Sequence, residues 1–125
     1  MTMPHERLRA LRWGYELLQE MGQDPSLPGD LREWAGVLLV VYPAPEMLAQ
    51  HVVDGLGGLP KAWADAMTEA KDLFEAVEFG GKGSVQTQRS LLFTRRHYPE
   101  RSLIELMVRS RFLEDWLAAA DPFGR

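Results

Sequence analysis

The sequence predicts an all-α protein, a compact bundle of about five to six short helices. Apolar residues recur at steps of three and four along most of the chain, which is the period of one helix face. The connections between these periodic segments are short and rich in Gly and Pro. The length of 125 residues is usual for one domain, so we expect a single helical domain over 1–125, with a possible subdivision near 80–84.

The first predicted helix begins near Pro4, a residue tolerated in a first turn, and Thr2 can cap it. Gly22 and the turn-forming segment that follows it end this helix. Its apolar face contains Leu8, Leu11, Tyr15 and Leu18.

The second predicted helix opens at Asp30, whose spacing to Glu33 resembles a capping box. It ends at Tyr42, because Pro43 restricts the backbone of the residue before it. Its interior, 37–42, could instead be a buried strand, since three valines lie among its six apolar residues. The cap, the length and the helical spacing favour a helix that is buried on most sides.

Four further helices are expected along the rest of the chain. Pro45 starts the third and Pro60 the fourth, while Ser84 is a good cap for the fifth, which ends at Tyr98. The sixth is expected to run to the residue before Asp121. The inward-facing residues of the fourth helix are Trp63, Met67, Ala70, Phe74 and Val77.

The tryptophans lie at apolar positions of these helices, including Trp116 in the sixth beside Leu113 and Leu117. A core position is therefore the expectation for all four of them.

Two segments of the sequence resemble one another weakly. "LLVVYPAPEML" at 38–48 and "TRRHYPERSLI" at 94–104 each place a Tyr-Pro pair between two helices, although few other residues match. The segments belong either to two copies of one helix–Tyr-Pro–helix unit or to unrelated corners where proline simply ends one helix and begins another.

The first of these halves also resembles a known family. "MTMPHERLRALRWGYELLQEM", then "DPSLPGDLREWA" and a Tyr-Pro pair, are similar to a family of short, uncharacterised proteobacterial proteins. Its members begin with Met-Thr-x-Pro-x-Glu-Arg, continue with an Arg-Ala-Leu-rich helix and close near an Arg-His-Tyr-Pro corner. The resemblance covers residues 1–48 and implies a bacterial or mobile-element source without any activity. This chain departs from the pattern at Val40-Val41, and its Arg-His corner appears only at Arg96–Pro99.

The composition excludes several classes of function. The chain has no cysteine, so disulfide frameworks, thiolate catalysis, iron–sulfur clusters and cysteine zinc sites are ruled out. No segment approaches the ~18–20 uninterrupted apolar residues that span a bilayer, and charges occupy the start where a signal peptide would be apolar. We therefore expect a soluble, cytoplasmic protein.

The net charge of −4 is unevenly distributed along the chain. Acidic residues outnumber basic ones over 1–81, and basic residues outnumber acidic ones over 82–125. Because acidic surfaces repel phosphates, any contact with nucleic acid is expected from the last third of the chain.

The Gly-rich stretch "FGGKGSVQT" is the nearest match to a phosphate-binding loop. The motif requires a Ser or Thr directly after its lysine, but Gly83 follows Lys82. Val77 stands where the first glycine of the motif is needed. This stretch is therefore interpreted as a turn between helices, with Ser84 as the cap of the second.

Two groups of residues were considered as metal ligands. Asp65, Glu69 and Asp72 share a face of the fourth helix, but lysines one turn away favour ordinary ion pairs on a solvated face. His51 and Asp54 lie one turn apart and form only half of a metal site. With no recognisable catalytic motif, we predict neither an enzyme nor a metal or cofactor site.

The stretch "FTRRHYPERS" at 93–102 carries the most distinctive side chains. Its arginines favour three roles: a helix-turn-helix that reads DNA, charges that oppose a helix dipole, or an interface with a protein. Pro99, Glu100 and Glu105 lie near the start of the presumed recognition helix, where negative charge would face phosphates. The candidate residues of this corner are Arg95, Arg96, His97, Tyr98 and Arg101.

We hypothesise a non-enzymatic bacterial protein that docks onto another protein, with homo-oligomerisation also possible. The basic corner and the acidic residues Asp65, Glu69 and Asp72 are the predicted partner-binding residues. A specific form of this hypothesis is a small acidic inhibitor or adaptor that docks onto a nucleic-acid-handling complex such as a host defence complex. The alternative is a regulator that binds DNA through its basic C-terminal third.

Overall fold

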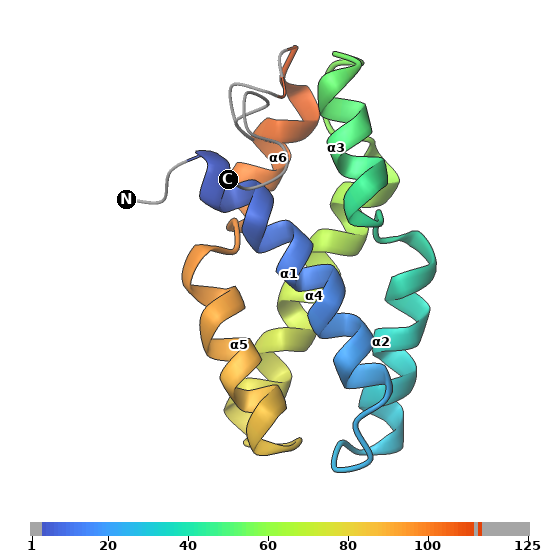
Figure 1. Ribbon diagram of the computed structural model, residues 1–125, viewed down its shortest axis with the longest axis vertical. Helices are drawn as coiled ribbons and strands as arrows, with labels where there is room; N and C mark the ends of the chain where they lie inside the picture. The colour runs from blue at the N-terminus through green and yellow to red at the C-terminus, as the bar shows by residue number, and fades with distance from the viewer. Residues whose placement is uncertain (1–3, 112, 114–125) are drawn as a thin grey trace.

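The computed structural model describes residues 4–111 and 113, and the described residues form six helices and no strand (Figure 1). The predicted all-α bundle is confirmed, and the ambiguous segment 37–42 belongs to a helix that ends beside the extended backbone of Tyr42. The helices are α1 (Pro4–Gly22), α2 (Gly29–Val41), α3 (Pro45–Val53), α4 (Lys61–Gly80), α5 (Val85–His97) and α6 (Arg101–Arg109).

The six helices form two halves with the same plan. Each half has a long helix, a helix of 13 residues, a Tyr-Pro corner and a helix of 9 residues. In Figure 1, α1 crosses in front and α4 behind, while α2 and α3 lie on the right and α5 and α6 on the left. The halves are thus related by an approximate two-fold axis along the length of the molecule.

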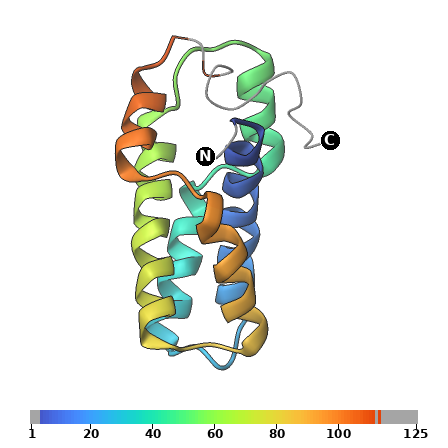
Figure 2. The ribbon, with the colours of Figure 1, turned by 90° about the vertical axis from the view of Figure 1, so that its left-hand side faces the viewer.

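The two halves are interleaved in the bundle. Helix α2 packs against α4 as well as against α1, and α5 packs against α1. Figure 2 shows the result from the side, with α1, α2, α4 and α5 side by side and α6 continuing α5 after a bend. Each half therefore completes the core of the other.

The tyrosines of the two Tyr-Pro corners meet in the centre of the molecule. The Tyr42 hydroxyl donates to the carbonyl of Leu11 at 2.7 Å, and the Tyr98 hydroxyl donates to that of Met67 at 2.8 Å. In both halves the acceptor lies 31 residues before the tyrosine, and the two hydroxyl oxygens are 3.4 Å apart. Equivalent bonds at equivalent positions favour two copies of one unit over two unrelated corners.

Burial raises the pKa of both tyrosines above the usual value of 10, so both hydroxyls remain neutral donors. They pack against Gly14 of α1, where a Cβ atom would lie 2.5 Å from the Tyr42 hydroxyl oxygen. The absence of a side chain at this position lets α1 approach both corners at once.

The core differs from the expectation at the tryptophans and at α2. Trp13, Trp34 and Trp63 are half-buried rather than fully enclosed, and Trp116 lies outside the described residues. On α2 the side chains of Val37 and Val40 are 61% and 85% exposed, so the prediction of a helix buried on most sides was wrong. The reason is that α2 contacts the bundle through one face only, which carries Ala35 and Leu38.

The helix ends confirm one predicted cap and correct another. Ser84 caps α5, because its hydroxyl accepts a hydrogen bond from the Thr87 backbone N–H at 3.1 Å. The capping box at Asp30 was wrong: α2 begins at Gly29 after Pro28 and has no side-chain cap. Asp30 instead lies in the first turn, where its charge favours the helix dipole.

Helix α6 is shorter than expected. It ends at Arg109, and the buried Leu113 lies in a turn; the other residues expected in its last part lie outside the described residues. The loop before α4 crosses this end, because the Leu59 backbone N–H donates to the Met107 carbonyl at 2.8 Å. That loop contact takes the place of a bond from a further helical turn.

Within the described residues, one stretch is long and apolar enough by length and composition to cross a membrane. It is Gly29–Val53, with a mean hydropathy of 1.3 in its best window, 28% of which is buried. The backbone leaves the helical conformation at Tyr42 and resumes it at Pro45, so the stretch forms two helices that both pack on the bundle.

Candidate functional site

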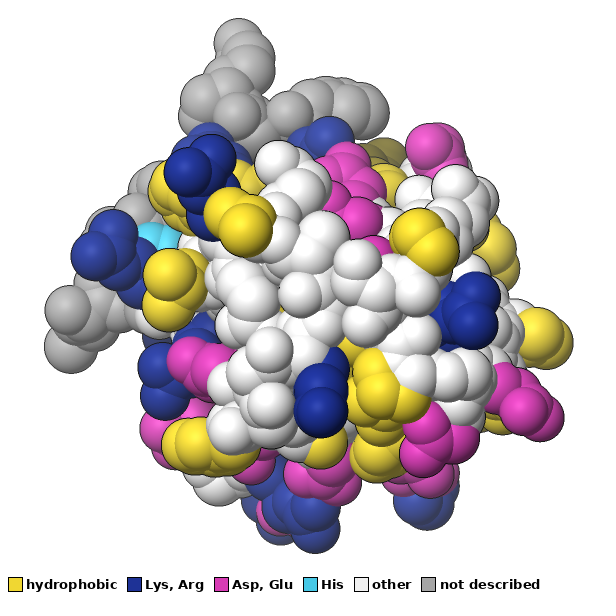
Figure 3. All heavy atoms as spheres, turned by 90° about the horizontal axis from the view of Figure 1, so that it is seen from below, with side chains coloured by type: hydrophobic (Ala, Val, Ile, Leu, Met, Phe, Trp, Pro, Cys, Tyr) yellow, Lys and Arg dark blue, Asp and Glu magenta, His cyan; other side chains and the backbone are white. Residues whose placement is uncertain are grey.

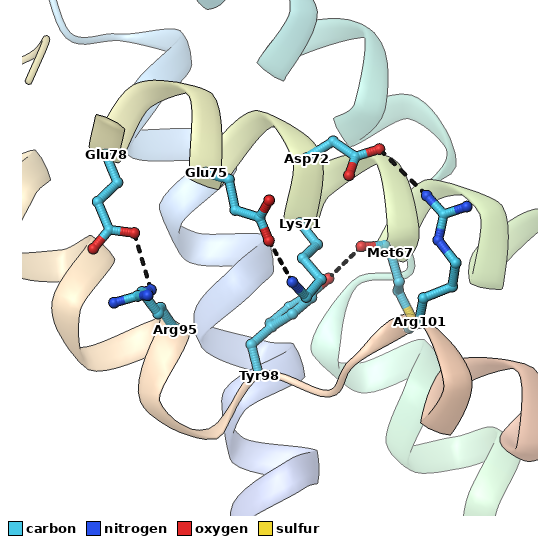
Figure 4. A network of polar contacts seen from close by, with 8 residues as sticks. All are labelled: Met67, Lys71, Asp72, Glu75, Glu78, Arg95, Tyr98 and Arg101. Carbon is cyan, nitrogen blue, oxygen red and sulfur yellow. Dashed lines mark hydrogen bonds and ion pairs between the residues drawn. The ribbon is translucent and has the colours of Figure 1, made fainter. Parts of the chain in front are cut away.

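The structure brings the basic corner and the acidic face of α4 together (Figure 4). The Nε atom of Arg95 lies 2.9 Å from a Glu78 carboxylate oxygen, and a terminal guanidinium nitrogen of Arg101 lies 3.7 Å from an oxygen of Asp72. Lys71 pairs with Glu75 one turn further along α4. Charges that the sequence assigns to opposite ends of the chain are therefore neighbours, and part of the charge is neutralised within the protein.

The predicted acidic residues lie along a groove of about 620 Å³ between α4 and α6, which Arg101 also lines. Asp65 pairs with Lys61 at 3.2 Å, as the spacing predicted, and Asp72 pairs with Arg101. Both pairs are exposed, so each contributes little to stability. The described part of the chain contains no group of three or more possible metal ligands.

A second hollow, which we name the corner pocket, has a volume of about 530 Å³ and lies between α4, α5 and the start of α6. Its lining includes Arg95, Arg96 and His97, which form the last turn of α5, where positive charge favours the helix dipole. Arg95 is held by Glu78, whereas Arg96 is exposed and has no ion pair within the described residues.

Tyr98 differs from the other predicted corner residues because it is only 8% exposed. Its ring packs edge-on against Phe74, with centroids 5.6 Å apart, and its hydroxyl is bonded to the Met67 carbonyl. Tyr98 therefore fixes the position of the corner and presents little surface to a partner.

The two-fold arrangement provides an internal comparison for the corner pocket. The equivalent positions of the first half carry no charged side chain, and yet that half folds in the same way. Packing of the bundle consequently does not require the charges of the pocket. In chain order, Lys71, Glu75, Glu78, Arg95, Arg96 and His97 correspond to Tyr15, Gln19, Gly22, Leu39, Val40 and Val41.

The sequence analysis missed the outer face of α5. Leu92 and Phe93 are 62% and 66% exposed, and with Arg89, Arg95 and Arg96 they line a hollow of about 510 Å³. On the side of the molecule where α5 lies, basic and hydrophobic side chains lie next to one another (Figure 3). The spacing of residues 89, 92, 93 and 96 was the available signal, because steps of three and four share one helix face.

Asp24, in the loop between α1 and α2, was also missed. Its carboxylate accepts hydrogen bonds from the Ser84 backbone N–H at 2.9 Å, the Thr87 hydroxyl at 2.7 Å and the Ser26 backbone N–H at 2.8 Å. The bond from Ser84 is the main reason that the pKa of Asp24 falls from 3.8 to about 2, against the opposing effect of burial. Asp24 and Tyr98 therefore hold α5 at its two ends.

No protein-family model, curated protein or solved structure matches this chain. The proposal below is accordingly based on the charges, exposure and contacts of its own residues.

Proposed function

We propose that the protein is a non-enzymatic interaction module that docks onto another protein through its second half. The observation that supports this proposal is the difference between the two halves at equivalent positions. The corner pocket is charged, whereas its counterpart around Tyr42 is not, and the fold is the same in both. Residues that the fold does not require are available for binding.

The chemistry of the corner suits a partner with an acidic surface. Arginine and aromatic side chains are enriched at the energetically important positions of protein interfaces. Arg96 is exposed beside Phe93, so both side chains can contact a partner without breaking an internal ion pair. Charge complementarity would also accelerate association and make it sensitive to salt.

Within this class, we propose a cytoplasmic adaptor or inhibitor of bacterial or mobile-element origin, with a nucleic-acid-handling complex as its target. The acidic groove between α4 and α6 supports this form of the proposal, because a protein that handles nucleic acid carries basic surfaces. The groove and the corner would then contact different parts of one assembly.

Binding of DNA by the α5–α6 corner is less well supported. Arg101, in the first turn of α6, is paired with Asp72, and Glu105 lines the groove that also contains Asp65 and Glu69. A phosphate backbone that approached α6 would meet these carboxylates. The test therefore includes nucleic acid as the competing partner.

The experiment is capture from nuclease-treated and untreated bacterial lysate with three tagged proteins: the wild type, Arg96→Glu and the control Arg32→Glu. Arg32 is an exposed arginine on α2, and the Arg95–Glu78 ion pair is left intact in every variant. We expect a stoichiometric protein partner that survives nuclease and is lost only with Arg96→Glu. Capture that disappears with nuclease, or that is the same for all three proteins, would contradict the proposal.

A further inference from the structure

The outer face of α5 is separate from the corner pocket and shares only Arg95 and Arg96 with it. We infer that this face binds an acidic amphipathic helix of the partner, with carboxylates on both sides of an apolar anchor. This inference rests on the proposed docking function and specifies the segment that would be recognised.

The geometry of the face defines the pattern of its ligand. Arg89 and Arg96 are seven residues apart, which places them about 10 Å apart along the helix axis. Leu92 and Phe93 lie between them on the same exposed side and border the 510 Å³ hollow. A partner helix with two acidic residues seven apart and two apolar residues between them matches this arrangement, since it has the same repeat.

The charges of the face determine the sign of the ligand. Val85–His97 contains no acidic residue, and none lines the hollow. Arg95 is paired with Glu78, but Arg89 and Arg96 form no ion pair within the described residues. Both guanidinium groups are therefore available for carboxylates, which they can bind with two parallel hydrogen bonds.

The face is also held rigid before a ligand arrives. Asp24 fixes the start of α5 through Ser84 and Thr87, and the buried Tyr98 fixes its end. A helix anchored at both ends loses little additional backbone freedom on binding, which favours affinity.

Helical size favours a peptide over nucleic acid or an anionic membrane. A short acidic helix contacts only the basic face, whereas a nucleic acid or a bilayer extends over neighbouring surfaces as well. Those surfaces include the carboxylates of α4, and the protein as a whole has a charge of −4. The wider anionic surface is therefore repelled where the short helix is not.

The test is a fluorescence anisotropy titration with a labelled helical peptide of about 20 residues that contains the pattern Glu-x-x-Leu-Phe-x-x-Glu. The proteins are the wild type, a double variant Arg89→Glu with Arg96→Glu, and an apolar variant Leu92→Ser with Phe93→Ser. Val37→Ser with Val40→Ser changes the equivalent face of α2 and is the matched control. All the substituted side chains are exposed, and thermal unfolding confirms that each variant is folded.

We expect salt-sensitive binding by the wild type and the control, with affinity at least about tenfold weaker in the other two variants. A peptide with Lys in place of both Glu residues should restore binding to the Arg89→Glu, Arg96→Glu variant. Equal affinity of all proteins for the acidic peptide, or no binding by the wild type, would overturn the inference. Tighter binding of the wild type to an oligothymidine or to phosphatidylserine vesicles would overturn it as well.

Failure of this inference is distinguishable from failure of the proposed function. A nuclease-resistant partner that depends on Arg96 but is captured equally well by the Leu92→Ser, Phe93→Ser variant leaves the docking function intact and overturns the inference. Loss of the partner on nuclease treatment overturns the docking function itself.

Discussion

Substitution of Gly14 by alanine tests the packing of the two tyrosine corners. Gly14 lies on α1, where a Cβ atom would be 2.5 Å from the Tyr42 hydroxyl oxygen and 2.9 Å from a ring carbon of Tyr98. Both distances are too short for real Cβ contacts, so α1 or both buried rings must move.

The expected cost follows from three contributions. Alanine improves helix propensity over glycine by about 1 kcal/mol. Overpacking in a dense core costs about 1–3 kcal/mol. Displacement of the Tyr42 hydroxyl from the Leu11 carbonyl costs about 1 kcal/mol more. The first and third contributions nearly cancel, so Gly14→Ala should destabilise the protein by about 1–3 kcal/mol.

Urea unfolding followed by circular dichroism measures this change, with Gly36→Ala as the matched control. Gly36 lies inside α2, and a Cβ atom there meets no heavy atom within 4 Å. The control should therefore be more stable than the wild type by up to about 1 kcal/mol. A Gly14→Ala variant at least as stable as the wild type would refute the close packing of α1 against the tyrosines.

Three further predictions concern stability. Tyr42→Phe and Tyr98→Phe should each lower the unfolding free energy by a similar amount, about 1–1.5 kcal/mol, because each loses one equivalent buried hydrogen bond; a large difference in urea unfolding would argue against equivalent halves. Asp24→Asn should cost about 1–2 kcal/mol at neutral pH. Because folding lowers the pKa of Asp24 from 3.8 to about 2, its contribution is complete above pH 3.8 and declines as the pH falls towards 2, and an unchanged pH profile in the variant would contradict this. Arg101→Gln removes an exposed ion pair and should change stability by no more than about 0.5 kcal/mol in the same assay.

Much of the fold could be predicted from local sequence signals. Pro43 and Pro99 mark the ends of the helices before them, and Ser84 marks the start of α5. Which side of a helix faces the core could not be predicted where every residue is apolar. In 37–41 and at Leu91-Leu92 the helical period has no polar residue to set its phase, so Val40 and Leu92 are exposed against expectation.

The candidate site could be predicted only in part, because its contacts join distant parts of the chain. The corner arginines are conspicuous in the sequence, but the pairing of Arg95 with Glu78 and of Arg101 with Asp72 depends on the packing of α5 and α6 against α4. The bond between Asp24 and Ser84 spans 60 residues and has no local signal. The difference in charge between the halves became interpretable only once the structure had aligned them.

Hydrogen–deuterium exchange of the protein, free and bound to its captured partner, tests the central claim most directly. Helices α2 and α5 occupy equivalent positions, so each serves as the reference for the other in one experiment. Docking through the second half predicts slower exchange in α5 and at the start of α6, with α2 unchanged. Slower exchange in α2 around Val37–Val41, with none in α5, would contradict the account.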